Sequence, residues 1–383
     1  MKRVIIIYWR FLKFNGSGRF LGGIETYISN LSELCVKLGY QVLIFQCASE
    51  EFLINENETQ IYGIKTPDLN PDKDYNLRKV LKHVKKIIDP KNDLIIFGNY
   101  TFSDYIDGVK TLAIQHGVAW DQPIKFMTQK KIFKNGIGEK IKRYILRKNA
   151  LTYFKKCQYK VCVDYNFLNW YRTYFDSNKY MHVILNSADI AEFDRISEKL
   201  NNNNYNNNFR ILFARRFEEF RGSKLIVPVV ENISKLNSNI KFTIAGSGTD
   251  ESFLRRSLEK FSNVTFLQYN SEDASKIVFD HDISIIPSFG SEGTSFSVAE
   301  AMGQGTAVIS TDAGGITNMI LDNFNGLIVN YTPEDFITAI MILYNNPEKR
   351  KELAYNAYKV AKATFSKEIW EKKWEALLKE ILC

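Results

Sequence analysis

Short apolar runs alternate with longer helical periods along the whole chain. The first cycle is an apolar run at residues 4–8, a helical period at 24–38 and a second apolar run at 41–45. Further runs follow at 94–97, 111–114, 161–163 and 183–185, and the pattern restarts at 210–214, 242–245, 283–286, 307–310 and 326–329. Strands that alternate with helices predict parallel sheets built from βαβ units. We therefore expect an α/β protein with two Rossmann-like sheets.

The length and one low-complexity segment divide the chain. A chain of 383 residues exceeds one ordinary core, and domains usually contain about 100–200 residues. Residues 201–208 are asparagines interrupted only by Tyr205, and such a segment cannot fill a core. We expect a first domain at 1–190, an Asn-rich linker or loop at 191–208, a second domain at 209–365 and a C-terminal helix at 366–383.

The stretch from residue 283 to residue 310 carries the strongest chemical signal. It predicts a strand that ends before Pro287, a loop of small residues, a helix and a second strand. Thr294, Ser295 and Ser297 offer hydroxyls that could cap the helix. A loop of this kind directs backbone N–H groups and a helix dipole toward a bound phosphate. Glu300 lies about one and a half turns into the helix and can face the same place.

This stretch resembles the signature of the retaining family 4 glycosyltransferases, which have the GT-B fold. In both, two glutamates are separated by seven residues; here they are Glu292, followed by Gly293, and Glu300, followed by Ala-Met. In that family the second glutamate holds the ribose hydroxyls of a nucleotide sugar, and the first lies beside the transferred sugar. The resemblance implies an α/β, GT-B architecture of two Rossmann-like domains that face a cleft. The alternative is a surface glutamate and an unrelated helical one.

Two features of the first half fit this resemblance. Gly22 and Gly23 open the first helix after a glycine-containing loop at residues 10–22, which the resemblance places at the interdomain cleft; the alternative is a mobile surface loop. The loop does not match the dinucleotide-binding fingerprint, so a dehydrogenase is disfavoured. His116 follows the strand at 111–114. The resemblance implies that it reaches the donor sugar, and otherwise it is an ordinary loop histidine.

Two cations follow the first strand of the second half. Arg216 and Arg221 match the arginine and the lysine of the family's Gly-Arg and Lys-Gly pattern, and Arg215 stands where its glycine would be. Arginines at a strand end suit a diphosphate, whereas the alternative is a solvated basic turn. Gly246 begins a Gly-x-Gly turn after the strand at 242–245. The resemblance implies catalytic residues Glu292, His116, Arg216 and Arg221, and substrate-binding residues Gly22, Gly23, Gly246, Gly293, Thr294, Ser295 and Glu300.

Composition excludes several other classes of protein. No apolar run reaches the about 20 residues of a membrane-spanning helix, and the N-terminus lacks a signal-peptide layout. The five cysteines are scattered and lack zinc-site spacing, as in a reduced cytosolic protein. No histidine cluster is evident, and the Asp280-His281-Asp282 triplet precedes a strand rather than following one. We expect no metal and no cofactor beyond the nucleotide sugar as co-substrate.

The positive charge is concentrated in one segment. Residues 125–160 contain twelve Lys or Arg and one acidic residue. Within them, residues 138–154 predict a helix with an apolar stripe flanked by Lys140, Lys142, Arg143 and Arg147. A basic amphipathic helix favours an anionic membrane surface. The alternative is a helix that packs in the core with a solvated outer face, and nucleic acid is disfavoured because no binding module accompanies the charge.

The resemblance, together with these observations, implies a retaining, metal-independent hexosyltransferase. It would move a sugar from a UDP-sugar, in preference to a GDP-sugar, to a glycan or lipid-linked acceptor in bacterial surface polysaccharide or glycoconjugate assembly. We expect it in the cytoplasm, peripheral to the inner face of the membrane. Two alternatives remain at this point: another GT-B enzyme such as a nucleotide-sugar epimerase, and a non-catalytic partner subunit of a glycosyltransferase.

Overall fold

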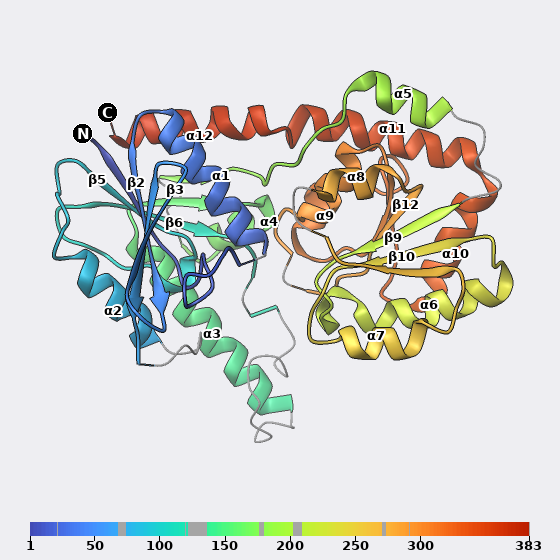
Figure 1. The fold of residues 1–383 in the computed structure, drawn as a ribbon, viewed down its shortest axis with the longest axis horizontal. Helices are drawn as coiled ribbons and strands as arrows, with labels where there is room; N and C mark the ends of the chain where they lie inside the picture. The colour runs from blue at the N-terminus through green and yellow to red at the C-terminus, as the bar shows by residue number, and fades with distance from the viewer. Residues whose placement is uncertain are drawn as a thin grey trace.

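The computed structural model describes residues 1–20, 22–67, 74–118, 120–121, 136–175, 180–201, 209–269, 273–290 and 292–382. They form two sheets, one at each end of the molecule (Figure 1). The first sheet has the order β3-β4-β2-β1-β5-β6-β7-β8 and the second β11-β10-β9-β12-β13-β14. All pairs are parallel except β3 with β4. The fold class predicted from the apolar pattern is therefore confirmed.

The strands of the first sheet are β1 (Arg3–Ile7), β2 (Gln41–Ala48), β3 (Phe52–Glu56), β4 (Thr59–Lys65), β5 (Asp93–Phe97), β6 (Lys110–Gln115), β7 (Tyr159–Cys162) and β8 (Met181–Val183). Its helices are α1 (Gly23–Lys37), α2 (Asp74–Val84), α3 (Gly136–Lys156) and α4 (Tyr165–Arg172). Alternate residues of β1 enter different cores: Val4 and Ile6 pack with α1, and Ile5 and Ile7 pack with α2. Because both faces are covered, the strand is an uninterrupted apolar run.

The strands of the second sheet are β9 (Arg210–Ala214), β10 (Lys241–Ala245), β11 (Val264–Leu267), β12 (Ile283–Ile286), β13 (Ala307–Ser310) and β14 (Leu327–Ile328). Its helices are α5 (Phe193–Asn201), α6 (Ser223–Leu236), α7 (Glu251–Leu258), α8 (Ala274–Phe279), α9 (Phe296–Gly303), α10 (Pro333–Asn345) and α11 (Pro347–Thr364). Ile211 and Phe213 enter one core, and Leu212 and Ala214 enter the other. Both sheets therefore have apolar layers on both faces.

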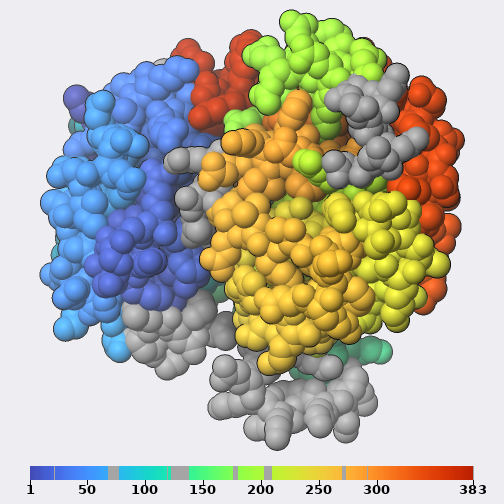
Figure 2. Space-filling model, turned by 45° about the vertical axis from the view of Figure 1, so that its right-hand side comes forward, coloured from blue at the N-terminus to red at the C-terminus, as the bar shows by residue number. Residues whose placement is uncertain are grey.

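Helix α12 (Lys367–Leu382) connects the second domain back to the first. Figure 1 shows it crossing the top of the molecule, so that the C-terminus lies beside the N-terminus. Trp374 is fully buried in the core of the first domain, and its indole N–H donates to the Tyr27 hydroxyl at 3.0 Å. In Figure 2 the red C-terminal residues lie between the blue first domain and the green α5. This helix fixes one side of the junction between the domains.

The segment between the two sheets contains more regular structure than its composition suggests. Residues 193–201, which lie within the predicted linker, form α5. Ile196 of this helix is buried with Tyr358 of α11, and the Tyr358 hydroxyl donates to the Ala191 carbonyl at 3.0 Å. The first part of the predicted linker thus packs on the second domain, because Ile196 supplies an apolar anchor. The asparagine run at 202–208 lies outside the described residues.

Candidate functional site

The carboxyl ends of the two sheets meet at the junction of the domains. The loop after β12 approaches the ends of β6 and β7 so closely that a Cβ at Gly293 would lie 2.6 Å from Val163 Cγ2 and 2.9 Å from the His116 carbonyl oxygen. The Thr294 hydroxyl donates to the Val163 carbonyl, and Asn186 Nδ2 donates to the Thr294 carbonyl at 2.6 Å. Only glycine fits at position 293, because this approach leaves no room for a side chain.

Glu292 is buried at this junction and is bound by two arginines. Its Oε1 atom lies 2.5 Å from Arg215 Nη2 and also accepts from the Ser288 hydroxyl at 2.5 Å. Arg221 Nη1 contacts the same oxygen. Burial alone would raise the pKa of Glu292, but Arg221 and Arg215 outweigh burial and lower the pKa to about 2. The carboxylate is therefore ionised at neutral pH and engaged in two ion pairs.

The two consecutive arginines after β9 occupy different environments. Arg215 is buried, whereas the Arg216 side chain is 51% exposed and lies 3.4 Å from Glu218. Arg216 Nη2 reaches across the junction to within 3.7 Å of where a Cβ would lie on Gly22. The sequence analysis gave Arg215 no role and noted only that it replaces the family's glycine. The structure shows that Arg215 is one of the two arginine partners of Glu292. Successive side chains point in opposite directions along extended backbone, so the sequence could have indicated that Arg215 and Arg216 have different surroundings.

The start of α9 is arranged differently from the predicted cap. Ser295 is the N-cap residue, but its side chain makes no capping hydrogen bond. The Thr294 hydroxyl binds the first domain, and the Ser297 hydroxyl donates to the Ala214 carbonyl at 3.3 Å. The expectation that these hydroxyls cap α9 is wrong, because tertiary contacts use them. The first-turn N–H groups consequently lack a side-chain cap, as in helices that bind an anion at this end.

Glu300 faces this region from α9. No described residue makes a hydrogen bond to its carboxylate that the structure records. Burial and the nearby Asp189 raise its pKa to about 7, against the opposing effect of Arg215. Tyr269, which follows β11, is close enough to Glu300 and Arg215 for both to affect its pKa, which is raised mainly by burial. A carboxylate in this setting can accept hydrogen bonds from ligand hydroxyls.

His116 is held in one protonation state. Its Nε2 atom lies 3.0 Å from the Gly98 carbonyl oxygen, and its ring meets the Tyr27 ring edge-on at 4.8 Å between centroids. Burial lowers the pKa of His116 to about 4. Because a carbonyl only accepts, Nε2 carries the proton of the neutral imidazole and Nδ1 is left as an acceptor. The structure brings the His116 backbone against Gly293.

The remaining predicted glycines line the same junction. Gly22 is the N-cap of α1, and Gly23 packs so closely on Phe296 of α9 that a Cβ would lie 3.1 Å from its ring. Gly246 follows β10 with φ +136°, and a Cβ there would lie 2.0 Å from the Arg215 carbonyl oxygen. Only glycine meets both requirements at position 246. The predicted site residues thus gather at the facing ends of the two sheets.

The described residues contain no group of three or more His, Cys, Asp or Glu that could hold a metal ion. In the Asp280-His281-Asp282 triplet, both ring nitrogens of His281 have partners, Ile277 O at 2.6 Å and Thr243 Oγ1 at 2.7 Å. Asp282 accepts from the Arg210 backbone N–H at 2.9 Å. The triplet therefore joins strands and helices of the second domain.

Comparison with known proteins finds relatives of this chain in sequence and in fold. Residues 194–360 match the sequence model of the family described as glycosyl transferases group 1. A glycosyltransferase of Methanocaldococcus jannaschii is 24% identical over 378 residues, which cover 92% of each chain. Sucrose-phosphate synthase from Thermosynechococcus elongatus superimposes with a TM-score of 0.76 over 99% of both chains, at 15% identity. Residues 194–360 thus match the group 1 glycosyltransferases, and the chain as a whole has the GT-B fold.

A second solved structure bears on the ligands of this fold. HepE of Anabaena, solved in complex with UDP and glucose, superimposes on this protein with a TM-score of 0.70. The alignment covers 99% of this chain and 100% of that chain, at 14% identity. The shared fold extends over both domains.

The protein has a second charged surface on α3, away from the junction. The first half of this helix extends beyond the rest of the first domain (Figure 1). Ile141 and Tyr144 are each 55% exposed there, whereas Leu151 and Phe154 of the second half are buried. The helix thus packs in the core only at its C-terminal half. The part of the basic segment at residues 122–135 lies outside the described residues, and no described helix is long and apolar enough to cross a membrane.

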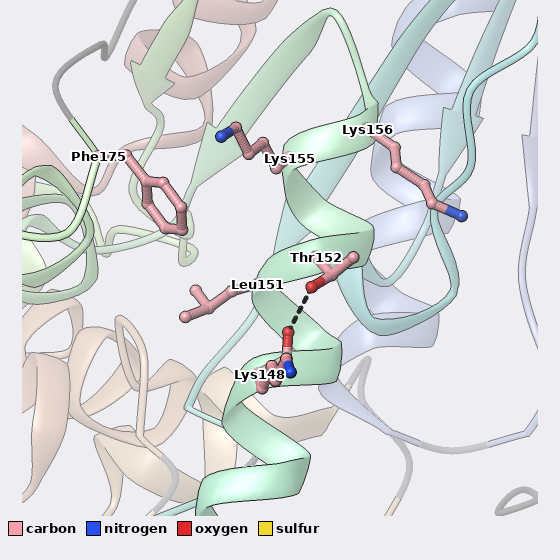
Figure 3. A pocket seen from close by; sticks show the side chains of 6 residues that line it. All are labelled: Lys148, Leu151, Thr152, Lys155, Lys156 and Phe175. Atoms are coloured by element: carbon pink, nitrogen blue, oxygen red, sulfur yellow. Dashed lines mark hydrogen bonds between the residues drawn. The ribbon is translucent and has the colours of Figure 1, made fainter.

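A hollow of about 430 Å³ adjoins α3. It is lined by Lys148, Leu151, Thr152, Lys155, Lys156 and Phe175. Figure 3 shows Leu151 and Lys155 on the side of the helix toward Phe175, and Lys156 extending from the opposite side. Lys155 Nζ lies 5.0 Å from the centre of the Phe175 ring. The apolar side chains of Leu151 and Phe175 in this hollow are thus bordered by lysines.

Two of the four basic residues predicted to flank the α3 stripe are engaged by the protein itself. The Lys142 Nζ atom is buried, and Arg143, whose side chain is 34% exposed, is bound by Glu139 at 2.9 Å and by the Trp120 carbonyl. Lys140, another of the four, is exposed, and so are Lys148 and Lys155. The predicted helix is confirmed, and part of its exposed charge lies on lysines outside the predicted four.

Proposed function

We propose that this enzyme transfers a sugar from a UDP-sugar to a glycan or lipid-linked acceptor with retention of the anomeric configuration and without a metal ion. The observation that carries the proposal is the combination at one junction of an uncapped helix start, buried arginines and the unpaired carboxylate of Glu300. An anion at the helix start and hydroxyls at Glu300 match the two ends of a nucleoside diphosphate. The HepE structure, which contains UDP, supports this choice of donor.

In this proposal the main catalytic contribution is charge stabilisation. When the sugar departs, negative charge grows on the diphosphate, and fixed cations and helix N–H groups stabilise it more in the transition state than in the ground state. Arg221 and Arg216 are the cations that we expect to contact the diphosphate. Arginines and N–H groups supply this stabilisation without a metal, which supports metal independence.

Glu292 is poorly suited to act as a covalent nucleophile or a general base. Its pKa of about 2 and its two arginine partners make its charge unavailable for proton transfer at neutral pH. We therefore assign it to orienting the arginines beside the sugar. This favours attack by the acceptor hydroxyl on the face that the diphosphate leaves, with the proton passing to the departing diphosphate. His116, neutral at pH 7 with Nδ1 as acceptor, would hold a sugar hydroxyl.

The proposal is tested with the purified full-length enzyme. Calorimetry with UDP, GDP and ADP in the presence of a chelator should show binding of UDP. Incubation with UDP-sugars and an acceptor extract should yield a product whose anomeric configuration, read by NMR, equals that of the donor sugar. Binding of none of the nucleotides, or an inverted product, would contradict the proposal. Release of an epimerised sugar without any acceptor would instead favour an epimerase.

We further propose that α3 brings the enzyme to an anionic membrane that carries a lipid-linked acceptor. The exposed apolar side chains of its first half and the lysines around the hollow support this. Apolar side chains among basic ones are the composition of surfaces that bind anionic lipid. Arg147 Cζ lies 5.7 Å from the centre of the Tyr144 ring and 5.6 Å from the centre of the Tyr174 ring.

A further inference from the structure

Arg215 lies at the junction, but the sequence analysis does not include it among the residues expected to bind substrate. Its side chain is 5% exposed and contacts Glu292 through Nη2. Its charge also acts on Glu300 and on Tyr269. Arg215 therefore contacts the glutamate expected beside the sugar and is near enough to the glutamate expected to hold the ribose to affect its pKa. The diphosphate joins those two parts of a nucleotide sugar.

Two of the three guanidinium nitrogens of Arg215 are unsatisfied. Nε and Nη1 are buried and have no hydrogen-bond partner among the described residues. A buried polar group without a partner usually destabilises a protein, and more so when it is charged. Buried guanidinium groups normally have most of their N–H groups paired. Such an arrangement is expected where a ligand supplies the missing acceptors.

A role as a simple counter-ion for Glu292 does not explain Arg215. Arg221 and Ser288 already contact the same Oε1 atom of Glu292. Arg215 and Arg221 both contact one ionised glutamate, whereas Arg216 lies 3.4 Å from Glu218. Because two arginines share the single charge of Glu292, their surroundings favour an additional anion.

We propose that Arg215 is a donor-binding residue: its unpaired N–H groups donate to phosphate oxygens of the nucleoside diphosphate while Nη2 remains on Glu292. The inference rests on the proposed function, since it assumes that a nucleotide binds at the junction. In this proposal Arg215 makes the buried part of the diphosphate contact. The family spacing instead selects the next residue, Arg216.

The test separates phosphate contacts from nucleoside contacts. The wild-type enzyme is titrated with UDP and uridine, and the same titrations are made with Arg215→Lys and Arg215→Gln. Arg256→Gln, an exposed arginine on α7, serves as the matched control. Loss of charge-assisted hydrogen bonds should weaken UDP binding by about ten- to a hundredfold in Arg215→Gln. Uridine binding should change by less than about threefold, and the control should bind both ligands as the wild type does.

Arg215→Lys keeps the charge and can still reach Glu292, but it lacks the additional planar N–H groups. It should fold as the wild type does and still bind UDP more weakly. Equal losses for UDP and uridine, or unchanged UDP affinity in a folded Arg215→Lys variant, would reduce Arg215 to a structural role and overturn the inference. If the wild type binds neither UDP nor another nucleoside diphosphate, the proposed function fails first and the inference with it.

Discussion

The two concentrations of positive charge in this protein differ in burial, and burial decides how strongly and how locally each can act on an anion. At the junction, Arg215 and Arg221 are held against Glu292 with side-chain exposures of 5% and 19%. On α3, Lys140, Lys148 and Lys155 are exposed. Buried charges interact strongly and are weakly screened by salt, whereas exposed charges act weakly and over a wide surface. The junction is thus suited to one defined anion, and α3 to many anions at once.

The largest effect should follow from breaking the buried ion pairs. Glu292→Gln leaves two buried arginines without their carboxylate, so the free energy of unfolding at pH 7 should fall by about 3–5 kcal/mol. The pKa of Glu292 is about 2 in the folded protein, which is below its ordinary value. Its contribution is therefore complete above the ordinary pKa and is lost as the pH falls toward 2.

Urea unfolding of wild type and Glu292→Gln at pH 7, 5 and 3 measures this effect. The difference between the two should be largest at pH 7 and should narrow at pH 3. Glu348→Gln, an 85%-exposed glutamate on α11, is the matched control and should change the free energy of unfolding by less than about 0.5 kcal/mol. A constant difference across this pH range would show that Glu292 does not act through its charge.

The second effect concerns turnover. Arg221→Ala removes a cation that we expect to stabilise the growing diphosphate charge, so kcat should fall by about 10²–10³. It should fall more than the affinity for the donor, because the charge is largest in the transition state. Steady-state rates with saturating UDP-sugar measure this, with Arg256→Ala as control. A fall in affinity alone would assign Arg221 to ground-state binding.

The sequence predicted the βαβ units because buried parallel strands leave a strong apolar signal. β12 and β13 have the predicted bounds. The hairpin of β3 and β4 was missed, because Leu53 between Phe52 and Ile54 breaks the alternation of apolar and polar residues that marks a half-buried strand. Asn57 and Glu58, with φ of 46° and 60°, form its two-residue turn without the glycine that usually marks such turns.

The prediction of the site was incomplete where a tertiary contact decided the arrangement. Spacing selected Arg216 and gave no role to Arg215, which the structure places against Glu292. A helix-start pattern predicted hydroxyl caps, and this was wrong because Thr294 binds Val163 of the other domain. Local patterns do not contain the position of the opposite domain, so neither contact could be read from them. The location of Glu292 and Glu300 near one junction did follow from their spacing on a loop and a helix.

A smaller effect should appear in nucleoside binding as the pH changes. The pKa of Glu300 is raised to about 7, and the ionised carboxylate is the better acceptor for ribose hydroxyls. Uridine affinity should therefore rise about tenfold between pH 6 and pH 8, following the ionised fraction. Uridine is used because it lacks phosphates that could titrate in this range. Glu300→Gln should bind uridine more weakly at pH 8 and lose the pH dependence; a dependence that persists in this variant would assign it to another group.

The raised pKa of Glu300 also affects how the free energy of unfolding changes with pH. A carboxyl group whose folded-state pKa exceeds its ordinary value opposes folding more as it ionises, so stability falls as the pH rises from the ordinary pKa of 4.5 to about 7. This is opposite to the effect of Glu292, whose pKa is lowered. The two glutamates of one loop and helix should therefore give opposite slopes in the same unfolding series.

The smallest effect per residue should be found on α3. Each basic residue near an anionic bilayer contributes about 1 kcal/mol, so replacing Lys140, Arg147, Lys148 and Lys155 with Ser should weaken sedimentation with vesicles containing phosphatidylglycerol in a graded manner. Added salt should weaken it further, since these charges are exposed.

The matched control replaces Lys79, Lys82, Lys85 and Lys86, exposed lysines on and just after α2, and removes equal charge from the same domain. If both sets reduce sedimentation equally, net charge explains the binding; if neither does, or if neutral vesicles bind as well, α3 is not a membrane contact. UDP binding should stay unchanged in both sets, because the junction arginines are untouched.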